Sequence, residues 1–211
     1  MERKRVGLAL GGGGARGMAH VGVIRVLERE GIPIDCLAGT SAGALVGAAY
    51  AAGIQGQELL EMALRIRWRD IARPVWPRQG FFSFERLESY LIQLVGDLSF
   101  AQLKLPYAAM TTDLATGRQV ALKEGRLALA VRASCSVPGL VTPVEIDGRH
   151  LVDGGIVNNL PISVTRELGA DVVVAVGLPF QLLESKLLGQ KGSQMGEEDS
   201  HIYILFFCCP A

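Results

Sequence analysis

The sequence has little that would staple a small secreted domain or hold a metal ion. Its 211 residues include only four cysteines and three histidines. The cysteines, Cys36, Cys135, Cys208 and Cys209, have neither the spacing of a metal site nor that of a disulfide framework. We therefore predict no metal and no cofactor. Reduced cysteines are typical of a reducing compartment, so a cytoplasmic location is expected.

No charge of one sign dominates, and no apolar run is long. Lys plus Arg and Asp plus Glu number 21 each, so global charge predicts no nucleic-acid partner. No stretch approaches the roughly 18 apolar residues of a membrane span. The basic start, Glu2 to Arg5, and the apolar residues Val6 to Leu10 imitate a signal peptide, but the apolar run is too short. The oligomeric state stays open.

The chain is rich in apolar residues, which make up 49% of it, and in glycine, of which it has 26. A chain of this length buries one sizeable core, so we expect one main domain. Apolar periodicity and Gly/Pro punctuation predict strands near 5–10, 34–38, 107–113, 118–122, 141–146, 149–152 and 172–177, and helices near 17–30, 42–53, 56–67, 84–95 and 125–133. Their alternation predicts an α/β fold, with the active site at the carboxyl ends of its strands.

The most informative segment is Gly39-Thr40-Ser41-Ala42-Gly43, between an apolar strand and a helix. A serine at such a corner, with glycine on either side, has the pattern of a nucleophile elbow. The neighbours must be nearly free of side chains, because the following helix packs tightly under the strand. By itself the pattern is moderately specific, since a glycine-rich corner also serves packing.

A glycine loop, Gly-Gly-Gly-Gly-Ala-Arg-Gly at residues 11–17, follows the first predicted strand. Such loops let backbone N–H groups approach an anion, and the helix behind adds positive potential. One interpretation is a dinucleotide fingerprint at Gly12, Gly14 and Gly17, with Asp35, 18 residues further on, as the ribose-binding acid. We favour the other interpretation, an oxyanion hole, because the chain delivers the elbow serine into the same crevice.

A third motif, Asp153-Gly154-Gly155, follows a short apolar strand. Taken alone, Asp-Gly-Gly is typical of a turn. Combined with the elbow and the glycine loop, Asp153 becomes a candidate base.

The three motifs, in this order, resemble the patatin-like phospholipase family. The resemblance covers roughly residues 5–176, and the segments 16–23, 132–139, 158–161 and 169–176 also match its bacterial branch. It implies a three-layer sandwich whose mostly parallel central sheet is flanked by helices. It also implies a serine acyl hydrolase that cleaves carboxylic esters of phospholipids or related lipids, through a Ser–Asp dyad and an acyl-enzyme intermediate.

Carried over to this chain, the resemblance makes Ser41 the nucleophile and Asp153 its base. An unperturbed aspartate is a weak base for a hydroxyl, so burial has to raise its pKa. His150 lies too close in sequence to Asp153 for a Ser-His-Asp relay, and His20 and His201 are likewise expected to be structural or solvated. The expected oxyanion hole comprises Gly12, Gly13, Gly14, Ala15, Arg16, Gly17 and Ala42, with Gly39 and Gly43 shaping the elbow.

A second class of function stays open on the same scaffold. Because a fold does not guarantee chemistry, a catalytically weak protein that senses acyl chains or anions is the alternative.

The predicted hydrolase domain spans residues 1–178, and residues 179–211 form an atypical tail. Relatives commonly carry an acid just after the last strand, where this chain has Gly177, and the helices that usually follow are missing. An uncovered sheet edge is an aggregation liability, unless the apolar residues 201–209 fold back as a strand. A disordered, truncated or frame-shifted tail is the other alternative.

Aromatic residues are scarce, at 6% of the chain, and both tryptophans and three of the phenylalanines lie in one segment. Residues 65–86 contain Trp68, Trp76, three phenylalanines and six arginines against Asp70 and Glu85, a net charge of +4. Aromatic and cationic residues together favour the water–lipid interface. One hypothesis is a flap that docks on anionic membranes and admits an acyl chain; the other is a loop whose aromatics fill the core and whose arginines are solvated.

Overall fold

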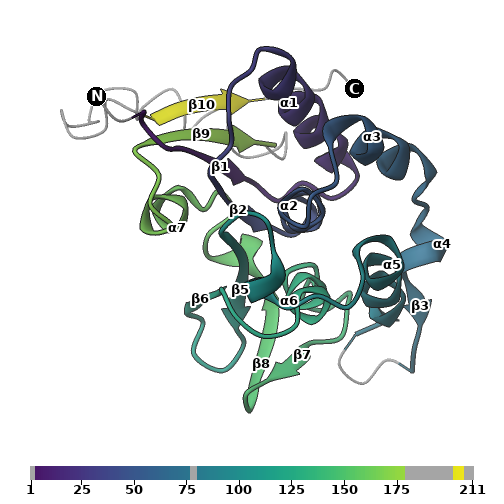
Figure 1. Cartoon of the computed structure of the whole chain (residues 1–211). Coiled ribbons are helices and arrows are strands. Elements are labelled where there is room, and N and C mark those ends of the chain that lie inside the picture. The colour runs from purple at the N-terminus through teal and green to yellow at the C-terminus, as the bar shows by residue number, and fades with distance from the viewer. Residues whose placement is uncertain (1–2, 77–79, 179–201, 207–211) are drawn as a thin grey trace.

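A computed structural model describes residues 3–76, 80–178 and 202–206. Its centre is a sheet with the strand order β10-β9-β1-β2-β5-β8-β7, in which β6 also pairs with β5 (Figure 1). The strands are β1 (Val6–Leu10), β2 (Cys36–Thr40), β5 (Tyr107–Asp113), β6 (Gln119–Leu122), β7 (Val144–Ile146), β8 (Arg149–Asp153), β9 (Val172–Gly177) and β10 (Ile202–Phe206). Strands β10 to β5 pair in parallel, and β6, β7 and β8 pair antiparallel, so the sheet is mixed and mostly parallel.

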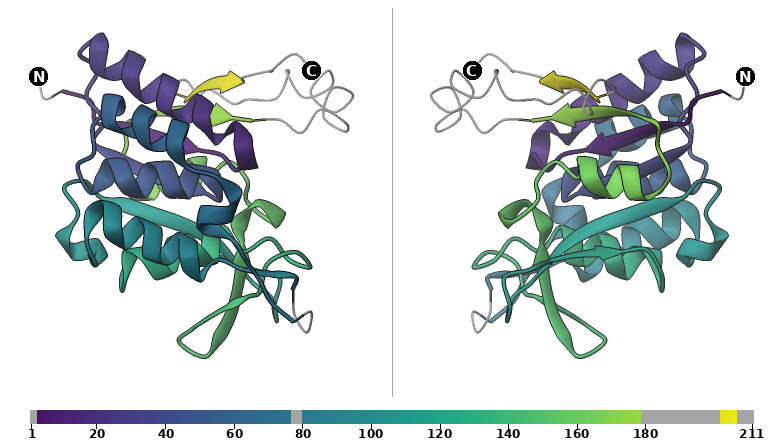
Figure 2. Two further views of the ribbon diagram at one scale, coloured as in Figure 1. Left: turned by 90° about the vertical axis from the view of Figure 1, so that its right-hand side faces the viewer. Right: turned by 90° about the vertical axis from the view of Figure 1, so that its left-hand side faces the viewer.

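Helices cover both faces of the sheet, so the three expected layers are present (Figure 2). One face carries most of them, and the short α7 lies on the other. The helices are α1 (Met18–Arg29), α2 (Ala42–Ala51), α3 (Gly56–Arg65), α4 (Trp68–Ile71), α5 (Glu85–Val95), α6 (Leu127–Ser134) and α7 (Ile162–Glu167), with 3₁₀ turns η1 (Gly14–Gly17), η2 (Phe100–Gln102) and η3 (Gly154–Ile156). A small hairpin, whose strands β3 (Arg73–Pro74) and β4 (Phe82–Ser83) have two residues each, forms a second sheet.

The core is divided by the alternation of side chains along the strands. Leu8 and Leu10 of β1 face the larger helical layer, whereas Ala9 between them faces α7. The α7 side of the sheet is built from small residues, among them Ala38 and Ala175. Small side chains let this short helix approach the sheet closely, while larger aliphatic side chains fill the thicker layer opposite.

The predicted elements are present, with differences at their ends and two omissions. β2 ends at Thr40 rather than at residue 38, so Ser41 follows the strand directly. Helix α7 was not predicted, because six residues are too few to show a helical period. The segment from α4 to β4 was also missed, since its elements have four residues or fewer.

The outer edge of β9 is covered by β10, which pairs with it in parallel from Ile202 opposite Val173 to Phe206 opposite Gly177. Residues 202–206 therefore form a returning strand, and a truncated or frame-shifted origin of the tail stays an open alternative. His201, Cys208 and Cys209 lie outside the described residues, and the boundary at residue 178 stays a prediction. Among the described helices, none is long and apolar enough to cross a membrane.

Candidate active site

Two strands end opposite neighbouring residues of β5, which brings the candidate nucleophile and base together. Thr40, the last residue of β2, pairs with Met110, and Asp153, the last residue of β8, pairs with Thr111. Because β6 occupies the other edge of both β5 residues, β2 and β8 share one edge and meet at their carboxyl ends. Ser41, one residue beyond Thr40, therefore lies beside Asp153, and its hydroxyl hydrogen-bonds the carboxylate.

The corner at Ser41 has the strained backbone of a nucleophile elbow. Its φ of 53° and ψ of −120° lie in a region that residues with a side chain rarely adopt. The flanking glycines are required by close approach: a Cβ atom at Gly39 would meet the backbone of Gly43, and one at Gly43 would meet the Leu10 carbonyl. The strand and helix can cross here only without these side chains.

A turn after α6 holds both Ser41 and Asp153, and sequence reasoning gave it no role. The Ser134 hydroxyl accepts a hydrogen bond from the Ser41 N–H at 2.9 Å and donates to the Met110 carbonyl at 2.6 Å. The Cys135 thiol donates to the Ser41 carbonyl at 3.3 Å, and the Asp153 N–H donates to the Ser136 carbonyl at 2.8 Å. The only signal in the sequence was the match of residues 132–139 to the family.

The carboxylate of Asp153 is buried, with 6% of the residue exposed. Burial raises its pKa, and the hydrogen bonds that it accepts from the Ser41 hydroxyl and, at 2.8 Å, from the Gly155 N–H only partly offset this rise. A raised pKa makes this aspartate a better proton acceptor than an exposed one. The sequence analysis required burial to raise the pKa of Asp153, and the pKa is shifted in that direction.

The glycine loop is attached at its start, and its later N–H groups find no acceptor among the described residues. The N–H groups of Gly11 and Gly12 donate to the carbonyls of Val176 and Asn159, at 3.0 and 3.2 Å. Within residues 3–76, 80–178 and 202–206, those of Gly13 and Gly14 donate to no protein group. Gly14 has a φ of +58°, which favours glycine. The loop thus presents backbone donors beside the elbow.

The other residues predicted for the oxyanion hole lie where the loop meets the elbow. Ala15, Arg16 and Gly17 form η1, in which the Arg16 N–H donates to the Gly13 carbonyl. A Cβ atom at Gly17 would lie 2.7 Å from that of Ala42, so the loop packs directly on the start of α2. The structure brings all seven residues together; whether each one acts on an oxyanion stays a prediction.

His20 is a structural residue, as expected, and it supports the glycine loop. Its fully buried ring donates from Nε2 to the Gly11 carbonyl at 2.7 Å, so Nε2 carries a proton, and Nδ1 has no hydrogen-bond partner among the described residues. Burial lowers its pKa to about 4. The exposed His150 differs from Asp153 by an odd number of residues along β8, so the two side chains point to opposite faces of the sheet.

Acid is expected to weaken the fold through His20. Between pH 6.5 and 4 the unfolded chain binds a proton that the folded chain does not, so stability falls as the pH falls, by about 3 kcal/mol in total. Urea unfolding at several pH values should show a smaller fall for His20→Gln than for wild type. His150→Gln should keep the wild-type fall; an equal slope in His20→Gln would contradict this assignment.

The dinucleotide interpretation fails on the position of Asp35. This residue precedes β2, at the amino end of the sheet, whereas the glycine loop leaves the carboxyl end of β1. Its carboxylate forms an ion pair with Arg3 at 2.7 Å and accepts from the Val6 N–H at 2.7 Å. A strand length separates it from any anion held in the loop. Within the part of the chain that the structure describes, no cluster of His, Cys, Asp or Glu could hold a metal ion.

A cavity of about 430 Å³ opens at Ser41 and has a mostly apolar lining. Gly14, Ala15, Gly17 and Ala42 line it near the nucleophile. The remaining wall comes from α2, α3, α4, α5 and the residues after Cys135, and includes Leu45, Met62, Trp68, Phe84, Leu87 and Leu140. A hydrocarbon chain is the chemistry that such a wall accommodates, because it offers contact surface and few polar partners.

The core-filling interpretation of the aromatic segment 65–86 holds for only part of it, and the membrane interpretation stays a prediction. Trp68 packs edge-on against Phe82 and Phe84, with ring centroids 5.7 and 5.5 Å apart. Phe84 is buried beside the cavity, whereas Trp68 is 51% exposed. Trp76 and Phe81 are 83% and 58% exposed, so their side chains do not belong to the core. Residues 77–79, which include one of the six arginines, lie outside the described residues.

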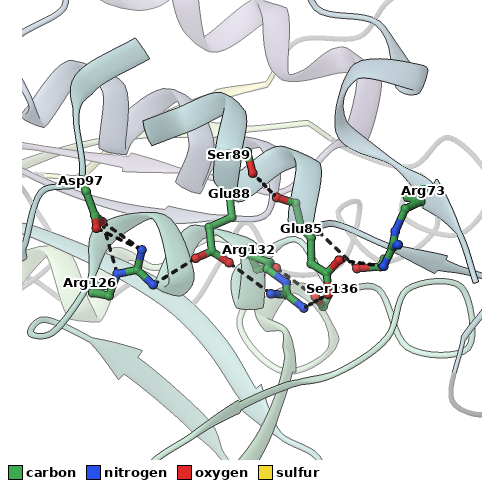
Figure 3. A network of polar contacts seen from close by, with 9 residues as sticks. Arg73, Glu85, Glu88, Ser89, Asp97, Arg126, Arg132 and Ser136 are labelled. Atoms are coloured by element: carbon green, nitrogen blue, oxygen red, sulfur yellow. Dashed lines mark hydrogen bonds and ion pairs between the residues drawn. The ribbon is translucent and has the colours of Figure 1, made fainter. Parts of the chain in front are cut away.

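A chain of ion pairs joins this segment to the turn that holds Ser41 and Asp153 (Figure 3). Arg73 of β3 pairs with Glu85 at 2.8 Å, and Arg132 of α6 pairs with Glu88 at 3.1 Å and with Glu85 at 4.0 Å. The Ser136 hydroxyl donates to the Arg132 carbonyl at 2.9 Å. Since Arg132 and Glu88 are mostly buried, the pair fixes the end of α6, from which the turn begins.

Comparison with known proteins gives one family. A sequence model described as Patatin-like phospholipase matches residues 8–166. An uncharacterized NTE family protein of Mycobacterium tuberculosis is 42% identical over 177 residues, which cover 82% of this chain and 49% of the relative. A lysophospholipase of Aspergillus fumigatus is 36% identical over 179 residues, covering 82% of this chain and 12% of that protein. The chain thus spans about half the length of the mycobacterial relative.

Solved structures give the same fold at low sequence identity. VipD from Legionella pneumophila superimposes with a TM-score of 0.66 at 14% identity, over 89% of this chain and 52% of VipD. The type III effector ExoU gives a TM-score of 0.59 at 14% identity, over 99% of this chain and 47% of ExoU. At this level of identity the likeness bears on the fold alone.

Proposed function

This chain belongs to the patatin-like phospholipase family, and from that premise we propose that it is a serine hydrolase of lipid carboxylic esters, with Ser41 as nucleophile and Asp153 as base. One observation carries the proposal: the hydroxyl of a strained elbow serine hydrogen-bonds a buried carboxylate whose pKa is raised, at the end of an apolar cavity. The lysophospholipase relatives supply the ester class.

The reaction divides into acylation and deacylation. The Ser41 Oγ attacks the ester carbonyl carbon while its proton passes to Asp153, and the carbonyl oxygen takes the displaced electron pair. The N–H groups of Gly13 and Gly14, with that of Ala42 at the start of α2, would stabilise this oxyanion. The intermediate collapses, the alcohol leaves with the proton from Asp153, and an acyl-enzyme remains. Water then attacks the acyl carbon while its proton passes to Asp153, and the Ser41 Oγ leaves with that proton as the fatty acid is released.

The geometry explains why no histidine is needed. Asp153 contacts the Ser41 hydroxyl directly, so the proton moves in one step between the two groups. The turn 134–136 keeps them adjacent through its hydrogen bonds to the backbone of both residues. A base with a raised pKa that contacts the nucleophile contributes roughly 10²- to 10⁴-fold in rate.

The decisive experiment is product analysis with the purified protein. A phospholipid with a fluorescent acyl chain is incubated with the protein, and the products are separated by chromatography. Release of fluorescent fatty acid supports the proposal. Unchanged lipid, together with absence of labelling by a fluorophosphonate, which reacts only with an activated serine, would refute it.

For the partner of the aromatic segment, we propose an anionic membrane surface. Trp76 and Phe81 are exposed between the strands of the hairpin whose Phe82 packs on the cavity-lining Trp68, and Arg65 and Arg69 keep 81% and 74% of their side chains exposed. Their pairs with Glu61 and Asp70, at 3.6 and 3.8 Å, are solvent-exposed and weak. The rings would sit at headgroup depth and the guanidinium groups on lipid phosphates. The expected cytoplasmic location stays a prediction.

Co-sedimentation with vesicles tests this surface. Each arginine near an anionic bilayer adds about 1 kcal/mol, so the double variant Arg65→Gln/Arg69→Gln should bind phosphatidylserine vesicles about thirtyfold more weakly than wild type. Arg29→Gln is the matched control, because this arginine on α1 is 72% exposed in a similar surface pair. Added salt should weaken wild-type binding. Equal, salt-insensitive binding by all three proteins would overturn the proposal.

A further inference from the structure

The carboxamide of Asn159 reaches the glycine loop from a distant part of the chain. Its Oδ1 accepts a hydrogen bond from the Gly12 N–H at 3.2 Å, and its Nδ2 donates to the Gly12 carbonyl at 3.5 Å. The Asn159 carbonyl accepts from the same Gly12 N–H, also at 3.2 Å. One residue therefore contacts both backbone polar groups of Gly12.

The same carboxamide lies beside both members of the dyad. A Cβ atom built on Gly12 would be 2.5 Å from Asn159 Oδ1 and 3.3 Å from the Ser41 Cβ. One built on Gly155 would be 3.1 Å from Asn159 Oδ1 and 3.0 Å from Asp153 Oδ1. Asn159 thus stands next to the reacting groups, but its hydrogen bonds go to the loop.

The orientation of one peptide unit follows from these contacts. The Gly12 carbonyl and the Gly13 N–H belong to the same trans peptide, in which the two groups point in opposite directions. When Asn159 holds the carbonyl, the Gly13 N–H has to point away from Asn159. Glycine on both sides leaves this peptide with little intrinsic preference, so an external contact decides its orientation.

We propose that Asn159 is a positioning residue for the oxyanion hole: its carboxamide fixes the Gly12–Gly13 peptide so that the Gly13 N–H is available to the oxyanion. The proposal rests on the proposed function, since it assigns how the donor loop of that same site is held. Asn159 does not titrate, so it takes no part in proton transfer. A peptide turned the other way would present a carbonyl, which repels an oxyanion.

Kinetics of Asn159→Ala separate positioning from binding. Loss of an oxyanion donor costs roughly 10²- to 10³-fold in rate, and a donor that is present but badly oriented costs less, so we expect kcat to fall roughly 10- to 100-fold. KM should stay within about twofold, because the ground-state ester needs no oxyanion donor. Asn158→Ala is the matched control: that neighbouring side chain donates to Gln119 at 3.0 Å, away from the loop.

A transition-state analogue gives a readout that a merely structural role would not move. An alkyl trifluoromethyl ketone adds the Ser41 Oγ to its carbonyl carbon, the proton passes to Asp153, and the product is an anionic hemiketal. Its inhibition constant should rise in Asn159→Ala by the same factor as kcat falls. In Asn158→Ala neither should change by more than about twofold.

A double-mutant cycle with Gly12→Ala identifies the partner. In wild type the new methyl group would lie 2.5 Å from Asn159 Oδ1 and displace the carboxamide, whereas in Asn159→Ala that contact is absent. The two effects on kcat should therefore be clearly less than additive. Because each variant is compared at its own measured folded fraction, a loss of folding does not imitate this result.

The outcomes separate this inference from the proposed function. If the wild-type protein releases no fatty acid and is not labelled by a fluorophosphonate, the proposed function is wrong. If wild type is active but Asn159→Ala behaves as Asn158→Ala does, only the role of Asn159 is wrong. A fall in kcat with unchanged ketone affinity, or additive effects in the cycle, would also overturn it.

Discussion

Replacing Ser41 by alanine is expected to lower ester hydrolysis at least about 10⁴-fold and to abolish fluorophosphonate labelling, while the protein stays folded. The hydroxyl contributes the nucleophile and little packing, because Ser41 lies at the mouth of a cavity. Fatty-acid release and in-gel labelling measure the two effects. Ser89→Ala, which removes an exposed hydroxyl on α5, is the matched control and should keep full activity.

Stability measurements sharpen this test. At φ 53° alanine is as strained as serine, whereas glycine is not, so Ser41→Gly should be inactive yet more stable than Ser41→Ala by about 1 kcal/mol. Turnover at the wild-type rate in either variant would show that the proposed mechanism is wrong. Binding of fatty acid with no turnover in wild type would instead favour the lipid-sensing alternative.

Replacing Asp153 by asparagine is expected to lower kcat by at least about 10²-fold, because the amide cannot accept the Ser41 proton. The amide oxygen can still accept the hydrogen bond from the Gly155 N–H, so the turn is kept. His150→Ala, three residues earlier on the same strand, should retain nearly wild-type kcat. A greater loss in a folded His150→Ala protein would favour a triad over the dyad.

The raised pKa of Asp153 leads to two further predictions, one for the pH dependence of the wild-type rate and one for the pH dependence of stability. On acidification, the wild-type rate should begin to fall at a pH above the pKa of an ordinary aspartate, since the base must be ionised. Between the ordinary and the raised pKa the folded chain binds the extra proton, so stability declines as the pH rises through this window. Asp153→Asn should lose that decline and be no less stable than wild type at pH 7.

The local features of the candidate site could be predicted from the residues alone. Glycine on both sides of Ser41 and the run 11–14 have a local cause, the close approach of backbone to backbone or of N–H groups to an anion, and a local cause is legible in the residues concerned. The long elements were also predictable, because burial imposes a period on the side chains within each of them. The family followed from the order of three such motifs.

Which of these residues come into contact depends on how distant strands pack together, and this could not be predicted from the residues. That Ser41 contacts Asp153 depends on β2 and β8 ending opposite Met110 and Thr111, and register between distant strands leaves no mark on either one. The hydrogen bonds of Ser134, Cys135 and Asn159 to the elbow and the loop were invisible for the same reason. The sequence left Asp35 as a candidate ribose ligand, and the structure removed it by placing it at the opposite end of the sheet. The cavity wall combines the glycine loop with five further helical and loop segments, so its apolar character belongs to their packing and to none of them alone.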